Sequence, residues 1–157
     1  MPVPLMRLQV PPQWAVCYNQ FFDVAPVVED GGRLNDTYFK EDLLWMQSLR
    51  SCATPDVPYE MDPGGWLADI GWYPEGEPAG AYSLHLFRLD PAEDSWPSEP
   101  PRFRSPNRFL VRSVLEYVLA RLHAGEASEG APERLLELQR IHDDGHMVEF
   151  LSEQGFT

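Results

Sequence analysis

The only run of metal-ligand residue types in the chain is His142-Asp-Asp-Gly-His146. Two histidines spaced i, i+4 on one helix face bind a shared Zn²⁺ in several zinc proteins. Gly145 interrupts that helix, however, and the sequence nominates no third ligand, which a catalytic zinc site needs. We therefore expect a polar corner between two helices, with Asp143 and Asp144 capping the second helix, and no metal.

Few residues are candidates for a catalytic acid, base or nucleophile. His85 lies in the middle of an expected strand, where an imidazole of near-neutral pKa suits a general base. Asp69 and Asp23 interrupt apolar strands and would form an acid and base pair if they met, but the sequence does not fix their separation. Cys17 is expected as a buried apolar residue. Because glycine-rich phosphate loops and the GxSxG motif are also absent from the sequence, we predict no catalytic residue and no cofactor.

Aromatic residues flanked by carboxylates occur in two connections rich in proline or glycine. Trp72 and Tyr73 lead into the acidic segment 74–80, and Trp96 lies within the acidic segment 90–101. Aromatic residues are the usual anchors of protein interfaces, and carboxylates steer a basic partner toward them. Trp72 equally fits a core position, and acidic loops also serve solubility. The predicted partner-binding residues are Tyr73, Glu75, Glu77, Asp90, Glu93, Asp94, Trp96 and Glu99.

The net charge limits the kind of partner. The 157 residues include 25 Asp and Glu against 12 Lys and Arg, which gives a formal net charge of -13. Nucleic acids and anionic membranes bind clusters of Lys and Arg, so neither is expected as a partner. The charge suits a basic protein partner, although it also serves ordinary solubility.

The chain shows no export signal and no membrane-spanning stretch, since none approaches the roughly 18 apolar residues that a span needs. Cys17 and Cys52 form no CxxC pair, and two free thiols in a reducing cytosol are expected, with a disulfide as the alternative. We expect a cytoplasmic protein. Its oligomeric state is left open.

Hydrophobic periodicity predicts the elements that position these residues. Alternating apolar residues predict strands at 14–24, 66–73 and 81–89 and around Phe103. Helical spacing predicts helices at 38–50, 106–123, 132–142 and 147–156. Ser105 is the expected cap of helix 106–123, and Trp14, Val16 and Tyr18 are expected on one strand face. The segments rich in proline and glycine, 25–37, 51–65 and 90–101, are expected as loops.

This order of elements predicts an α+β fold with a mainly antiparallel sheet. One long amphipathic helix, at 106–123, is expected on a face of the sheet, followed by a short helical C-terminal tail. Strands 66–73 and 81–89 should form a hairpin. Residues 1–124 are the expected core domain, and residues 125–157 are its helical appendage.

Residues 14–122 resemble the small acidic immunity proteins encoded beside bacterial polymorphic toxins. The resemblance lies in acidity, in element order and in the succession of a WYP turn, a strand and a helix. It is carried by WAVCYNQFFDV, KEDLLWMQSLR, GWYPEGEPAGAYSLHLFRL and FRSPNRFLVRSVLEYVLARL. It implies a protein without catalysis that binds a cognate toxin domain, often over its active site, and protects the cell that makes it. It assigns no residue roles and does not cover the tail after Gly125.

Two other functions remain open on the sequence. One is a small enzyme with dispersed site residues, among them His85, Asp69 or His142. The other is an adaptor or chaperone that holds a secreted effector before export. A concave pocket with a perturbed titratable group would favour the enzyme, whereas an acidic convex or grooved surface would favour the inhibitor.

Overall fold

The computed structural model describes residues 2–35, 37–93, 96–125 and 130–156, which form an α+β fold. The strands of the described chain are β1 (Trp14–Asn19), β2 (Leu44–Thr54), β3 (Val57–Met61), β4 (Trp66–Tyr73), β5 (Ala81–Arg88) and β6 (Arg102–Ser105). Its helices are α1 (Arg108–His123), α2 (Ala131–Asp143) and α3 (Met147–Glu153). The strands pair antiparallel in the order β1-β2-β4-β5-β6, and β3 pairs with β2. The predicted α+β class and antiparallel sheet are confirmed.

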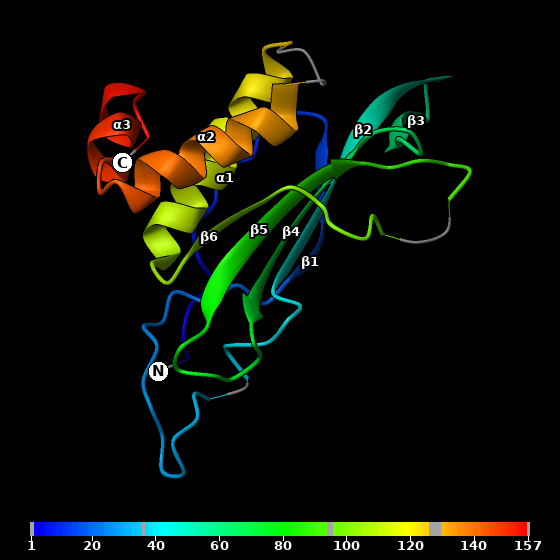
Figure 1. Cartoon of the computed structure of the whole chain (residues 1–157). Coiled ribbons are helices and arrows are strands. Elements are labelled where there is room, and N and C mark those ends of the chain that lie inside the picture. Colours follow the sequence, from blue (N-terminus) through cyan, green and yellow to red (C-terminus); the bar gives the residue numbers. More distant parts are fainter. Residues whose placement is uncertain (1, 36, 94–95, 126–129, 157) are drawn as a thin grey trace.

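One face of the sheet and the three helices enclose the core, and Figure 1 shows the helices gathered on that side. The β4–β5 hairpin is formed as predicted, with Trp66 paired to Arg88 and Tyr73 to Ala81. Its core-facing side chains alternate along each strand, as expected for a sheet covered on that face. They are at most 1% exposed: Ala68, Ile70, Trp72, Tyr82, Leu84 and Leu86.

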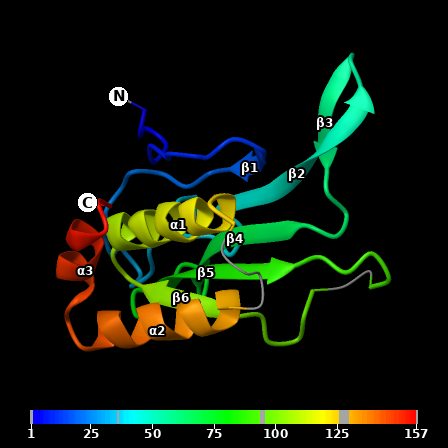
Figure 2. The same cartoon turned by 90° about the horizontal axis from the view of Figure 1, so that it is seen from above.

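The helical layer is divided between two helices rather than dominated by one long helix. α1 has 16 residues, α2 has 13 and α3 has 7. Figure 2 shows α1 over the sheet and α2 beside β6. The apolar side of the predicted amphipathic helix is buried in α1, at Val111, Val114, Leu115, Val118 and Leu119. α2 and α3 contribute Leu135, Leu138, Met147 and Leu151 to the same core cluster. The described tail residues therefore share the core of the sheet.

Helix α1 begins later than predicted, because Asn107 and not Ser105 is its N-cap. Asn107 Oδ1 accepts hydrogen bonds from the N–H groups of Phe109 (2.9 Å) and Leu110 (3.3 Å). Ser105 Oγ instead accepts the N–H of Asn107 at 3.1 Å. The serine thus shapes the turn before the helix, a common local use of a hydroxyl.

The helix predicted at 38–50 is wrong, because residues from Leu44 onward form β2, which lies between β1 and β4. Leu44 and Met46 face the core, whereas Trp45 faces the opposite side. Apolar residues occupy both faces of this strand, so the period-two alternation is lost. The remaining spacing of apolar residues then imitates a helix.

The loop predicted at 51–65 is wrong for residues 51–61, which hold the end of β2, a two-residue turn and all of β3. Pro55 lies in the two-residue turn between Thr54 and Val57. Pro58 lies in β3, which pairs with β2 alone among the described strands. Proline is tolerated in an edge strand because its missing N–H leaves no ladder bond unmade. Figure 1 shows β2 and β3 as an arm that projects away from the helices.

Strand β1 is shorter than the predicted 14–24, and its register shifts between Val16 and Tyr18. Val16 pairs with Met46, whereas Tyr18 pairs with Trp45. Since adjacent residues of β2 project to opposite faces, Val16 and Tyr18 do so as well. The prediction that Tyr18 shares a face with Trp14 and Val16 is therefore wrong, and the irregularity turns Tyr18 toward the helix-free side of the sheet.

Candidate functional site

A single row of paired residues crosses the helix-free face of the sheet. Tyr18 pairs with Trp45, Trp45 with Asp69, Asp69 with His85 and His85 with Arg102. Side chains of directly paired residues project to the same side, so this row presents its five side chains together. We call this surface the open face.

Three large aromatic residues of the open face remain exposed. Tyr18 is 42% exposed, Trp45 43% and Trp96 49%. Trp96 comes from the 89–101 connection and lies over β5, with its ring centroid 5.0 Å from that of Phe87 and 6.2 Å from that of His85. Exposed aromatic side chains grouped in this way are typical of binding surfaces.

The open face contains a cleft of about 500 Å³ beside these aromatic side chains. We call it the Asp69 cleft. Its lining consists of Cys17, Tyr18, Asp42, Leu43, Leu44, Trp45, Asp69 and Trp96. The cleft combines aromatic walls with two carboxylates, a composition suited to recognising a ligand with apolar body and positive charge.

Asp69 is a buried carboxylate within this cleft. Its side chain is 6% exposed and that of His85 is 12% exposed, and Asp69 Oδ2 lies 3.5 Å from His85 Nδ1. That separation exceeds a normal hydrogen bond, and neither atom has a hydrogen-bond partner among the described residues. Burial raises the pKa of the Asp69 carboxyl, His85 opposes that rise, and the charge of Asp42 adds to it.

Tyr73 lies near the same carboxylates as Asp69. Its ring packs edge-on against His85, with the centroids 5.9 Å apart. Burial, followed by the charges of Asp69, Glu41 and Asp42, raises the Tyr73 pKa to about 12. Its hydroxyl therefore stays protonated at neutral pH.

The open face continues along the β2–β3 arm. Leu49 pairs with Met61 and Ser51 with Tyr59, so these residues follow Trp45 on the same side of β2. Met61 is 40% exposed and Tyr59 is 45% exposed. The sequence did not reveal this extension, because the segment was expected as a loop.

The structure brings two of the predicted partner-binding residues together. Tyr73 is the last residue of β4, Trp96 lies in the connection after β5 at the other end of the hairpin, and both rings pack against that of His85. Glu75 and Glu77 lie at the Tyr73 end, where Arg33 contacts the carboxylate of Glu77 at 2.8 Å and the backbone oxygen of Glu75 at 2.7 Å. They therefore lie away from the Trp96 end of the hairpin.

The other predicted residues belong to the 89–101 connection. Asp90 is exposed and its side chain accepts the Ala92 N–H at 2.9 Å, while Glu93 is exposed. Glu99 lines a separate hollow of about 1030 Å³ beside β6 and α2. Asp94 lies outside the described residues.

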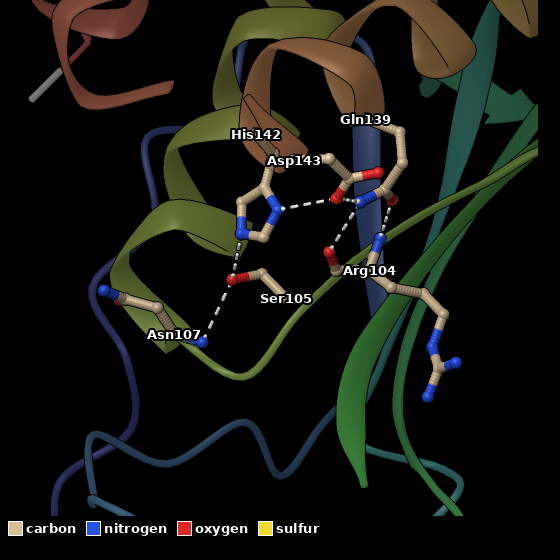
Figure 3. A network of polar contacts seen from close by, with 6 residues as sticks. All are labelled: Arg104, Ser105, Asn107, Gln139, His142 and Asp143. Carbon is tan, nitrogen blue, oxygen red and sulfur yellow. Dashed lines mark hydrogen bonds and ion pairs between the residues drawn. The ribbon is translucent and has the colours of Figure 1, made fainter. Parts of the chain in front are cut away.

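A second polar cluster joins α2 to β6, as Figure 3 shows. Gln139 accepts the Arg104 N–H at 2.7 Å and donates to the Arg104 carbonyl at 3.2 Å, as a neighbouring strand would. His142 Nε2 lies 3.0 Å from Ser105 Oγ, and its Nδ1 lies 3.3 Å from Asp143. Hydrogen bonds from Gln139 and His142 lower the pKa of Asp143. The cluster provides hydrogen-bond partners for the backbone N–H and carbonyl of Arg104 at the edge of β6, and it thereby holds α2 against that strand.

The remaining candidates for chemistry are dispersed. Asp23 pairs with Arg108 at 2.7 Å, whereas Asp69 faces His85. Cys17 and Cys52 are free thiols. Cys17 is exposed, so the expectation that it is buried is wrong, although partial desolvation of its thiol raises its pKa. Within the described ranges, no three His, Cys, Asp or Glu side chains gather closely enough to hold a metal ion. None of the described helices is long and apolar enough to cross a membrane.

No protein-family model, no curated protein and no solved structure matches this chain.

Proposed function

We propose that this chain is an immunity protein, which binds a cognate bacterial toxin domain and covers its active or substrate-binding site. The observation that carries the proposal is the group of exposed aromatic residues, Tyr18, Trp45 and Trp96, around an acidic cleft on the open face. Large aromatic side chains that are exposed in the free protein and buried on association supply most of the affinity of many interfaces.

The charge of the chain supports a basic partner. The net charge of -13 attracts a positively charged domain over a distance, and carboxylates beside the anchors orient its approach. Asp42 and Asp69 lie in the Asp69 cleft itself. The described acidic residues of the two connections, Glu75, Glu77, Asp90, Glu93 and Glu99, are assigned to the rim of the interface.

The arm supplies additional area for the same interface. Tyr59 and Met61 continue the exposed apolar surface beyond the body of the sheet. A stable protein complex buries on the order of 800 Å² on each partner. The open face and the arm together offer a longer contact surface than the cleft alone.

Co-expression tests this function. The C-terminal domain encoded by the neighbouring reading frame is produced in a bacterial host with and without this chain, and survival is scored. We expect that domain alone to stop growth and this chain to restore it. A domain that kills equally in the presence of this chain, or one that is harmless alone, contradicts the proposal.

A small enzyme is the second candidate, because the Asp69 cleft is concave and contains a carboxyl of raised pKa. Two observations weigh against it. His85 is covered by the rings of Tyr73 and Trp96, and the Cys17 pKa is raised where a nucleophile needs a lowered one. If protection of the host cell from the toxin required catalysis by this chain, Asp69→Asn and His85→Gln would abolish protection while leaving toxin binding intact.

A further inference from the structure

The Asp69 cleft has the composition of a site for an organic cation. Tyr18, Trp45 and Trp96 line it, and the negative faces of aromatic rings attract cations. Asp42 and Asp69 add two carboxylates. Among the described residues that line the cleft there is no Lys, Arg or His, and the basic group beside Asp69 is His85, whose Nδ1 lies 3.5 Å from Oδ2.

Asp69 is unusual because it is buried without full hydrogen bonding. Its side chain is 94% buried, and Oδ2 has no hydrogen-bond partner among the described residues. A buried acceptor left without a donor is destabilising. Because Asp69 lines the cleft, a cation bound there would lie near its carboxyl group.

The local field favours the same ligand. Burial raises the pKa of both Asp69 and Tyr73, and nearby carboxylates add to each rise: Asp42 for Asp69, where His85 opposes it, and Asp69, Glu41 and Asp42 for Tyr73. These like charges repel one another inside a partly desolvated cleft. A bound cation would relieve that repulsion.

We propose that the Asp69 cleft binds the guanidinium group of an arginine side chain presented by the protein partner. A guanidinium is planar, so it stacks on the rings of Trp45 or Trp96 while its forked N–H groups bond to carboxylates. The volume of about 500 Å³ also leaves room for the apolar stem of the side chain. The assignment of the guanidinium to an arginine of the protein partner rests on the proposed function. The proposal that the cleft binds a guanidinium group does not.

The site is tested without the partner, by two-dimensional NMR of the ¹⁵N-labelled full chain. N-acetyl-arginine amide is titrated while the five tryptophan indole N–H signals are followed. We expect the signals of Trp45 and Trp96 to shift. The signal of Trp72 should not shift, because its indole N–H is bonded to the Glu77 carbonyl at 2.9 Å on the core side.

Two further ligands separate the chemistries. N-acetyl-citrulline amide has nearly the same shape without the charge, and it should produce no comparable shift. Tetramethylammonium represents a small free quaternary cation, and it should bind more weakly than the arginine derivative because it has no N–H donors. Equal binding of citrulline overturns the cation site, and stronger binding of tetramethylammonium overturns its assignment to arginine.

Matched variants complete the test. Asp69→Asn and Asp42→Asn should each weaken binding of N-acetyl-arginine amide by about tenfold, the scale of a lost charged hydrogen bond. Asp56→Asn removes the same charge from the turn of the arm and should leave binding unchanged. The absence of any shift in the unmodified chain, or an equal effect of all three variants, overturns the proposal. Because no toxin is present, its failure would leave the co-expression result intact.

Discussion

The Asp69 carboxylate and the His85 imidazole face each other across β4 and β5, with Oδ2 and Nδ1 3.5 Å apart. Both side chains lie on the open face, and both are nearly buried by Trp96, Tyr73 and the walls of the Asp69 cleft. The pair thus places a buried carboxyl at the base of an aromatic surface, which is the surface that we propose as the interface.

The raised Asp69 pKa predicts how stability depends on pH. Its folded-state pKa lies above the ordinary aspartate value of 3.8, so the folded chain binds this proton more tightly than the unfolded chain. The Asp69 contribution to stability is therefore present at low pH and is lost as pH rises from 3.8 through the raised folded value.

Asp69→Asn removes that titration, so the variant should gain stability relative to the wild type as pH rises toward neutrality. Chemical denaturation of both proteins at a series of pH values measures the difference. A constant difference across the series would show that Asp69 ionises with an unshifted pKa.

The apolar stripe of α1 should dominate the stability of the core. Leu115 is 1% exposed, and Leu115→Ala should lower the free energy of unfolding by about 2–5 kcal/mol through lost burial and the cavity left behind. Leu136, which is 55% exposed in α2, provides the control. Leu136→Ala should change stability by less than about 0.5 kcal/mol. If urea denaturation gave similar losses in the free energy of unfolding for Leu115→Ala and Leu136→Ala, the placement of α1 against the core would be contradicted.

Gly71 allows the segment before β2 to approach β4. A Cβ at Gly71 would collide with the Glu41 carbonyl oxygen, whereas at Gly64 the nearest atom is 3.9 Å away. We expect Gly71→Ala to cost about 1–3 kcal/mol by overpacking and to displace the adjacent Asp42. Gly64→Ala should be better tolerated. Thermal melting compares the two, and equal melting temperatures would mean that this close approach does not exist.

Gln139 joins α2 to the edge of β6 by two hydrogen bonds to the backbone of Arg104. Gln139→Ala should cost about 1–3 kcal/mol, because it leaves both backbone groups without their side-chain partner. Hydrogen exchange should also show faster exchange at the Arg104 amide. The exposed Glu133→Ala in the first turn of α2 serves as a control, and unchanged protection at Arg104 in Gln139→Ala would refute this docking contact.

The fold was predictable where apolar residues occupied one face of an element. Trp66 to Tyr73 alternates cleanly, and Val111 to Leu119 repeats at helical spacing, so both elements were recovered. β2 was missed because Met46 faces the core while Trp45 lies on the opposite face. Its partners β1 and β4 are separated from it by intervening segments of the chain, and the turn to its adjacent partner β3 contains Pro55, so the proline-rich segment resembles a loop.

The candidate site was predictable only in part for the same reason. Trp96 was identified because an aromatic residue in an acidic, proline-rich connection has no obvious place in a core. Tyr18 and Trp45 were not, since the register shift in β1 and the strand identity of β2 decide which face they occupy. The pairing of Asp69 with His85 depends on the register of the β4–β5 hairpin, which the strand predictions alone do not fix.

The affinity of two surface variants for the toxin domain tests the open face most directly. Trp45 and Phe109 are almost equally exposed, at 43% and 42%, but Trp45 lies on the open face and Phe109 on α1. We expect Trp45→Ala to raise Kd by about 30-fold or more, as loss of an anchor of about 2 kcal/mol does. Phe109→Ala should leave Kd nearly unchanged, and both variants should keep the wild-type circular dichroism spectrum. Wild-type affinity of Trp45→Ala, or a larger loss in Phe109→Ala, would place the interface on the helical side and contradict the account.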